Sequence, residues 1–479
     1  MNGTGIASRA ERRLLSTAHV ALVFAIAIVS GPTVQAQADS ERPAYENFRF
    51  DEDWSSLRDP ALRTDFFDPI KWIPISQDGS WYLTLGGELR ERYETNDHPL
   101  FGLGTVSEND YLLHRLYLSG DLHLGPNLRS FVQLASGITA GWEGKPPPTQ
   151  QDQLDVLQAF AEVELPVGSG ASTLRGGRQE MSYGSSRLVS VRESPNIRRA
   201  FDGVRASWSN PSDLRIDGFL VRPVAPERGS FNDSSNQSQA FWGVYGTAPV
   251  PAVPDLLADL YYLGLENDDA EYAQGTATEH RHTIGARLFG KRAGYDWDLE
   301  AAFQFGTFGN ADIRAWTVSS DIGYTVTSWP FSPRLGLKAD AISGDDDLGD
   351  DTLGTFNPLF PKLPYFSEAN IAAPANLLDI QPNLTLALTP AVELGLAWNP
   401  LWKQADADAF YAPPLAPVAD TAGGSGSFLG QQFITSIEWV VTAQLSLGGT
   451  YVYFTPGDRL EEAGGQSGQF ASVWAKFLF

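Results

Sequence analysis

Arginine residues are concentrated in one segment of the chain, residues 174–208. The segment holds seven arginines against three acidic residues, a local excess of +4 in a chain whose formal net charge is −24 at pH 7. A guanidinium group presents a planar fork of N–H donors that matches the oxygens of a carboxylate or phosphate. The composition therefore predicts a site for anions built from Arg175, Arg178, Arg187, Arg192, Arg198, Arg199 and Arg205.

The elements that carry these arginines show the alternation of β-strands. In residues 81–94, Leu85 and Leu89 fall on one face, and Glu88 and Arg90 fall on the other. Segments of about ten residues with one apolar and one polar face are typical of tilted strands in a membrane barrel. The pattern predicts an all-β fold, a transmembrane antiparallel β-barrel of about eighteen strands. A secreted β-sandwich or propeller is the alternative fold. The same alternation recurs in residues 112–122, 128–134, 281–288 and 378–388.

Short and long connections alternate along the chain. In a membrane barrel, short turns face the periplasm and long loops face the outside, and we expect that arrangement here. The tight joins are predicted at residues 124–127, 209–212, 290–294, 389–390 and 440–442. The long connections are predicted at residues 137–153, 223–239, 266–279, 343–376, 403–430 and 456–468.

The beginning of the chain has the pattern of a secretory signal peptide. Arg9, Arg12 and Arg13 precede an apolar run over residues 20–29, and the small residues 36–38 follow at the spacing of a cleavage site. The apolar run is shorter than the roughly 20 residues that a membrane-spanning helix needs. We therefore expect a signal peptide over residues 1–38, and a chain with 0 cysteines that gains no stability from disulfides.

Two further segments complete the predicted organisation. Residues 39–79 are aromatic and charged, and we expect them to form a periplasmic lead-in packed at the barrel mouth. The barrel itself is predicted over residues 80–479, with its last strand paired to its first because an open edge in lipid leaves backbone groups unsatisfied. The terminal Phe479 suits an interfacial aromatic girdle and is the expected recognition point for the barrel assembly machinery.

Two blocks of sequence carry a resemblance to a known family. Residues 69–75 with 81–92, and the arginine-rich residues 176–205, resemble stretches of the alginate-export family of outer-membrane β-barrels. The resemblance extends over about residues 53–479 and implies an eighteen-stranded pore in the outer membrane of a Gram-negative bacterium. It also implies an arginine-rich lumen that passes an anionic polysaccharide. A long periplasmic plug is not evident, because the join at residues 440–442 is tight.

Strand parity predicts which charged side chains face the lumen, because residues opposite the apolar face point inward. Rings of basic side chains in a pore favour anions. Acidic residues predicted to face inward are Glu88, Asp121, Glu162, Glu164, Asp217, Asp298, Glu300 and Asp340. The predicted substrate-pathway residues are Arg90, Arg92, Arg115, Arg129, Arg178, Arg187, Arg192, Arg198, Arg199, Arg205, Arg215, Arg281, Arg287 and Lys338.

The role of a single lumenal arginine stays open between substrate contact and a salt-bridge ladder that braces the wall. The cluster in residues 174–208 favours substrate contact, because three acids cannot neutralise seven guanidinium groups. Arg175 and Arg178 have opposite parity on an unbroken strand. A bulge at Gly176 and Gly177 is therefore expected to reorient one of them.

The remaining features predict neither catalysis nor a cofactor. No GxSxG motif occurs, no Ser-His-acid grouping can be inferred, and without cysteine there is no thiolate chemistry. Residues 345–347 lack EF-hand spacing, so we interpret them as a solvated outer loop and predict no metal site. Expected partners are an anionic polysaccharide or small anionic solute, outer-membrane lipid and periplasmic secretion proteins, with no nucleic acid. A porin for uptake of small anions or nutrients is the main alternative, and a barrel enzyme is the remote one.

Overall fold

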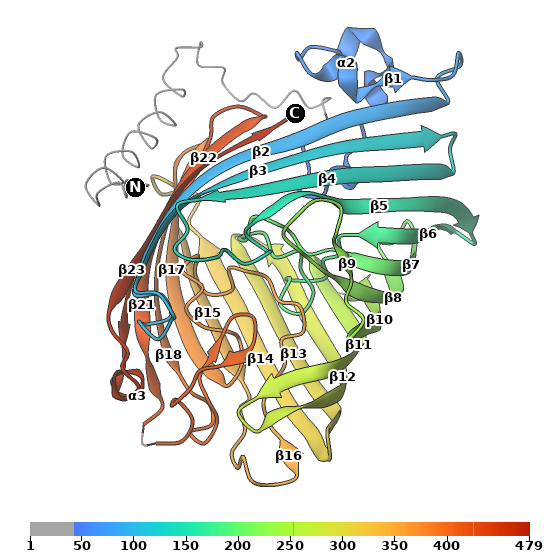
Figure 1. Ribbon diagram of the computed structural model, residues 1–479. Helices are drawn as coiled ribbons and strands as arrows, with labels where there is room; N and C mark the ends of the chain where they lie inside the picture. The colour runs from blue at the N-terminus through green and yellow to red at the C-terminus, as the bar shows by residue number, and fades with distance from the viewer. Residues whose placement is uncertain (1–42, 252, 425) are drawn as a thin grey trace, which may run out of the picture.

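The chain folds into a closed antiparallel β-barrel of eighteen long strands (Figure 1). The computed structural model describes residues 43–251, 253–424 and 426–479, so the predicted signal peptide lies outside the described residues. The barrel strands are β2 (Trp81–Asp97), β3 (Glu108–Leu124), β4 (Leu128–Ala140), β5 (Asp152–Val167), β6 (Gly170–Gln179), β7 (Phe201–Ser209), β8 (Arg215–Ala225), β10 (Gln239–Pro249), β11 (Leu256–Tyr272), β12 (Gly275–Arg292), β13 (Tyr295–Phe308), β14 (Ala311–Thr325), β15 (Arg334–Ile342), β17 (Leu377–Thr389), β18 (Val392–Trp402), β21 (Phe428–Val440), β22 (Leu445–Pro456) and β23 (Gly468–Leu478).

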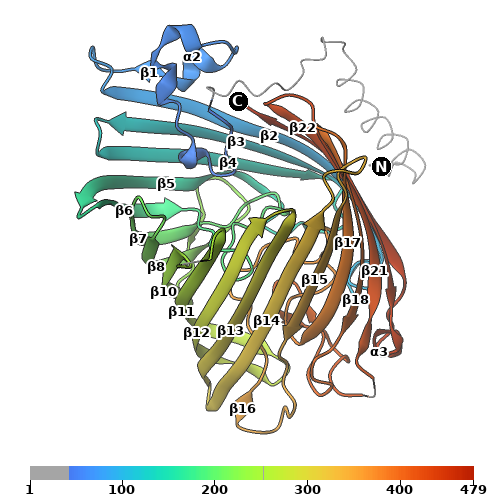
Figure 2. The same cartoon turned by 180° about the vertical axis from the view of Figure 1, so that it is seen from behind.

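The first and last strands close the barrel. β2 pairs with β23 from Glu88 opposite Leu478 to Asp97 opposite Gln469, and it pairs with β3 on its other side. Every long strand therefore has two antiparallel neighbours, and Figure 2 shows β10 to β15 side by side in one wall. Closure satisfies the backbone groups that an open edge would expose to lipid. The predicted barrel is confirmed, and the sandwich alternative is not.

Side-chain exposure follows the predicted alternation. On β2, Leu85 and Leu89 are each 36% exposed on the outer face, whereas Glu88 and Arg90 are each only 4% exposed on the inner face. The outward set is apolar because it meets lipid, and the inward set is charged because it meets other polar groups in the bore. In the part of the chain that the structure describes, no helix has the length and apolar character to cross a membrane.

Short turns lie at the end of the barrel that holds the lead-in and the C-terminus, called here the turn end; the opposite end is the loop end (Figure 1). One predicted loop is wrong. Residues 266–279 form a hairpin in which β11 and β12 are joined only by Ala273 and Gln274. The acidic residues there suggested a loop, but Ala270 and Tyr272 are buried, and the Tyr272 hydroxyl accepts a hydrogen bond from Asn357 at 3.0 Å. Contacts with a distant segment therefore extend the strands.

Two long connections fold into the barrel interior, as Figure 1 shows, although long loops were expected outside. The first covers residues 180–200, between β6 and β7. The second covers residues 343–376, between β15 and β17, and contains β16 (Thr352–Leu353). Backbone hydrogen bonds join them: Phe360 N–H donates to the Leu188 carbonyl and Lys362 N–H to the Ser186 carbonyl, both at 2.9 Å. Their buried Met181, Leu188 and Phe360 pack against the wall, which explains the inward fold.

The lead-in lies across the turn end of the barrel. Its short strand β1 (Ile73–Pro74) pairs with β2, and the Phe67 ring packs against those of Phe477 and Phe479. Phe50 reaches the rings of Phe131 and Phe160 on the wall. The other short elements are η1 (Arg49–Asp51), η2 (Ser55–Arg58), η3 (Pro60–Leu62), α2 (Asp68–Lys71), β9 (Ser234–Ser235), β19 (Tyr411–Ala412), β20 (Ala416–Pro417) and α3 (Asp458–Glu462).

Candidate substrate pathway

Arginines of the wall and of the 180–200 connection share carboxylates inside the barrel. Arg115 on β3 is fully buried, and its guanidinium lies 3.0 Å from Glu88 of the wall and 2.8 Å from Glu193 of the connection. Arg198 also pairs with Glu193, and Arg90 lies 3.6 Å from the same residue. One carboxylate therefore joins three guanidinium groups and holds the connection against the wall.

The shared carboxylate is ionised over a wide pH range. Burial alone would raise the pKa of Glu193, but Arg198 and Arg115 lower it well below the usual range of a glutamate. A carboxylate that receives several charge-assisted hydrogen bonds is favoured in its charged form. We conclude that Glu193 stays charged at neutral pH.

Two arginines of the same connection have no acidic partner among the described residues. Arg192 donates only a long bond of 3.5 Å to the Ile197 carbonyl, and Arg199 donates at 3.3 Å to the Ser190 carbonyl and lies over the Phe360 ring. Burial lowers the pKa of Arg199 and lowers that of Arg192 to about 10. A guanidinium group in a protein keeps its proton at neutral pH. They leave uncompensated positive charge inside the bore.

Other predicted pathway residues are fully paired. Arg187 of the connection lies 2.9 Å from Asp298 and 3.0 Å from Glu300 on β13. Arg287 lies 2.9 Å from Asp259 and 2.6 Å from the same Asp298. Acidic residues of the barrel wall thus neutralise arginines of residues 174–208 that the three acids within that segment are too few to neutralise. The remaining pairs are Arg92 with Glu94 and Glu368, Arg281 with Glu279, and Lys338 with Asp340.

A polar cavity of about 420 Å³ opens below the connection at the turn end. Arg129, Arg175, Arg205 and Arg215 line it on the basic side. Glu162 bridges two of them, at 3.1 Å from Arg129 and 2.7 Å from Arg175, and Arg205 pairs with Asp217 at 2.6 Å. No ion pair is found for Arg215 within the described ranges, and its side chain is exposed at the mouth.

Residues 47–51 of the lead-in form one wall of this cavity. The Arg129 guanidinium donates to the Phe50 carbonyl, and Arg198 donates to the Asn47 carbonyl at 3.0 Å. The Arg175 guanidinium lies between two rings, 4.4 Å from the centre of Phe50 and 4.0 Å from that of Phe160. Such cation–π contacts help to hold the segment around η1 against the wall. The lead-in therefore narrows the turn-end mouth.

Arg175 and Arg178 lie on opposite faces of β6, and no bulge turns either of them. β6 keeps continuous register with β5 and β7 through Gly176 and Gly177, so the predicted bulge is wrong. Arg175 points inward, and Arg178 lies on the outer face with Leu174, bound to Asp202 at 2.8 Å. Arg178 accordingly does not line the bore, because the strand has no irregularity to turn it inward.

Two basic residues inside the barrel, Arg334 and Lys362, are not among the predicted pathway residues. Arg334 shares the parity of Lys338 on β15, and it lies 2.5 Å from Asp296 and 3.1 Å from Asp321. Parity alone could have identified it. Lys362 lies on the 343–376 connection, where no periodic signal exists, and its ammonium lies over the Tyr365 ring.

A closed barrel with a charged bore and inward connections defines an outer-membrane channel. The family model described as alginate export matches residues 81–474. The chain belongs to the alginate-export family and is a protein of the Gram-negative outer membrane. No curated protein sequence matches it.

Solved channels share the fold at low sequence identity. Pseudomonas aeruginosa OccK3 (OpdO) superposes with a TM-score of 0.55 at 13% identity, over 83% of this chain and 95% of that chain. Acinetobacter baumannii OccAB1 gives 0.55 at 12% identity, over 86% and 98%. The outer membrane protein opdK from Pseudomonas aeruginosa gives 0.54 at 11% identity, over 83% and 98%. These likenesses confirm the barrel fold.

Proposed function

We propose that this channel exports an anionic, alginate-like polysaccharide through its bore. The observation that carries the proposal is the unpaired charge of Arg192 and Arg199 on a connection that crosses the interior. In the network around Glu193, Arg90, Arg115 and Arg198 pair with the carboxylates of Glu88, Glu180 and Glu193, and none of these carboxylates forms an ion pair with Arg192 or Arg199. A buried guanidinium without an acid favours an anion beside it, and uronate carboxylates match its donor fork.

Ion selectivity in planar bilayers tests the proposal. The wild-type barrel should prefer Cl⁻ to K⁺ under a KCl gradient, and oligouronates should block its current. The double variant Arg192→Gln, Arg199→Gln should lose much of both properties, because the bore loses two uncompensated charges. The matched control is Arg292→Gln, Arg314→Gln, which removes two exposed arginines from the outer side of the barrel. Cation preference of the wild type, or a double variant equal to the control, would contradict the proposal.

Uptake of a small anion is the second candidate. The narrow polar cavity of about 420 Å³ beside the lead-in favours a small solute over a polymer. Liposome-swelling rates separate the two functions. Rapid flux of a monomeric uronate, with no block by long oligouronates, would favour uptake and count against export.

The proposal assigns the charged residues of the bore to pairing and substrate contact and none to catalysis. Turnover of lipids or esters by the purified barrel would contradict that assignment. Periplasmic secretion proteins are proposed to meet the barrel at the turn end, where the lead-in is exposed.

The terminal strand is proposed to be the segment that the barrel assembly machinery recognises. Phe479 directly follows β23, and its carbonyl accepts hydrogen bonds from Gly87 N–H at 2.8 Å and from Arg49 at 3.1 Å. Deleting Phe479 should reduce the amount of heat-modifiable barrel in the outer membrane more than it lowers the stability of barrel refolded in detergent. Equal losses in the two assays would show that the residue acts only through these contacts.

A further inference from the structure

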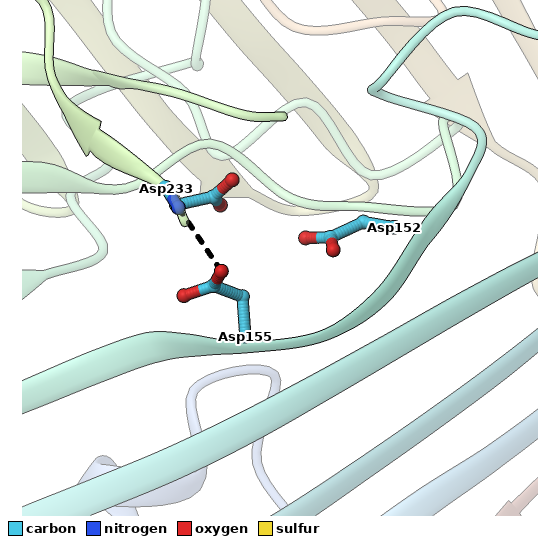
Figure 3. Close-up of side chains that lie close together, drawn as sticks. All are labelled: Asp152, Asp155 and Asp233. Atoms are coloured by element: carbon cyan, nitrogen blue, oxygen red, sulfur yellow. Dashed lines mark hydrogen bonds between the residues drawn. The ribbon is translucent and has the colours of Figure 1, made fainter. Parts of the chain in front are cut away.

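Three aspartates converge at the loop end of the barrel wall, away from the bore network (Figure 3). Asp152 and Asp155 stand at the start of β5, and Asp233 belongs to the connection between β8 and β10. Each offers one carboxylate oxygen, and these three oxygens all lie within 4.8 Å of one another. No sequence motif indicates this cluster, because Asp233 is 78 residues from Asp155 and no local spacing joins them.

Backbone pairing brings the connection against β5. Gln153 N–H donates to the Gly229 carbonyl at 2.9 Å, and Phe231 N–H donates to the Leu154 carbonyl at 2.9 Å. The Asp155 carboxylate accepts from the N–H of Asp233 at 3.0 Å, the bond drawn in Figure 3. Residues 229–233 thus lie beside the start of β5 through a single parallel β-bridge between Leu154 and Ser230, and this pairing positions the three carboxylates.

The Asp152 side chain is the second observation. It is 0% exposed, and no side chain among the described residues donates a hydrogen bond to either of its carboxylate oxygens. Figure 3 shows it directed toward Asp155 and Asp233. A buried carboxylate without a partner is strongly unfavourable, and two further carboxylates beside it increase the penalty.

The nearest basic group does not compensate the cluster. Arg178 approaches Asp155 only at 4.0 Å, and its main partner is Asp202 at 2.8 Å. Its other contact here is with the Asp233 main-chain carbonyl, at 3.3 Å. The cluster therefore lacks the positive charge that three converging carboxylates require.

We propose that Asp152, Asp155 and Asp233 bind one Ca²⁺ ion that fastens the β8–β10 connection to the outer rim of β5. The donor atoms are all oxygen, which suits a hard cation and disfavours zinc. Ca–O bonds of about 2.3–2.6 Å let oxygens on opposite sides of the ion lie about 5 Å apart, which accommodates the observed spacing. Mg²⁺, with bonds of about 2.0–2.1 Å, would require the three groups to move closer. Water completes the coordination shell.

Calorimetry on the full-length barrel in detergent tests the site. After treatment with EGTA, the protein is titrated with CaCl₂, and one site is expected with a dissociation constant on the order of 10⁻⁴ M, as in extracellular calcium modules. Asp152→Asn should weaken binding at least tenfold. The control Asp346→Asn changes an exposed residue of the other acidic segment and should leave binding unchanged.

A second readout follows the connection itself. Ca²⁺ should slow tryptic cleavage after Arg228 in the wild type and in Asp346→Asn, but not in Asp152→Asn. If Asp152→Asn does not fold, Asp233→Asn in the connection replaces it. Wild-type protein that shows no saturable Ca²⁺ binding would overturn the proposal, as would a folded Asp152→Asn or Asp233→Asn variant that binds as tightly as the wild type. Greater stability of Asp152→Asn without any Ca²⁺ effect on the wild type would also overturn it, and would show that the carboxyl groups share protons.

Discussion

The carboxylate of Glu193 offsets part of the positive charge inside the barrel. Removing its charge should therefore shift the ion selectivity of the channel toward anions. One carboxylate contacts Arg90, Arg115 and Arg198. Glu193→Gln keeps the size of the side chain and removes its charge. We expect the variant to prefer anions more strongly than the wild type, which is opposite to the effect of removing arginines.

The expected magnitude follows from the position of the group. The Glu193 side chain is 39% exposed, so its field acts through water. A unit charge at roughly 7 Å from a permeating ion, at an effective dielectric constant of about 80, contributes about 0.6 kcal/mol. Cl⁻ and K⁺ shift in opposite directions, so their permeability ratio changes by about 1.2 kcal/mol, or roughly eightfold. Screening at 0.1 M salt, where the Debye length is about 10 Å, reduces this to roughly threefold.

Reversal potentials measured at low and high KCl provide the assay. The ratio of Cl⁻ to K⁺ permeability should rise about threefold at 0.1 M KCl, with a larger rise at lower salt. Glu461→Gln removes an exposed acid on α3 and serves as the control for total charge. Heat-modifiability on gels checks that both variants retain the barrel. An unchanged or lower ratio in Glu193→Gln would refute the placement of this network beside the ion path.

Three further predictions concern the mouth, the paired wall and a loop. Deleting residues 43–52 removes the segment that Arg129 and Arg198 hold across the cavity and should raise single-channel conductance; an equal conductance would show that the segment does not restrict flow. Arg281→Met leaves the fully buried Glu279 without its guanidinium partner and should lower the free energy of unfolding by about 3–5 kcal/mol, measured by urea unfolding in vesicles. A loss below about 1 kcal/mol would contradict the pairing argument. Burial raises the pKa of Asp345 from 3.8 to about 6, so the folded state binds a proton at this carboxyl more tightly than the unfolded state does. The protonated carboxyl therefore stabilises the folded state at low pH, and this contribution is lost as the pH rises from about 4 to 6. Asp345→Asn should flatten that part of the stability profile, and parallel profiles would contradict it.

The strands were predictable because a barrel wall imposes a period of two on every segment. On β2, Leu85 and Leu89 lie on the apolar outer face and Arg90 lies on the inner face. This alternation can be seen in the sequence without knowing which strands pair with β2. The fate of the long connections was not predictable. Leu188 is buried against the wall and connected to Phe360, a residue 172 positions away, and no local pattern encodes such a contact. For the same reason, the ion pairs of Arg187 could not be predicted, because Asp298 and Glu300 lie more than 100 residues away along the chain.

Under the proposed function, the selectivity of the bore follows the imbalance of charge and not the number of arginines. Arg187 and Arg287 share Asp298, so both brace the wall and contribute little field to a passing ion. Arg192 and Arg199 have no such partner in the described chain, so no carboxylate offsets their charge. A simple count of basic residues would give these four arginines the same weight in ion selectivity. The ion pairs separate them, because the two arginines without an acidic partner both lie on the 180–200 connection, where the proposed function needs uncompensated charge.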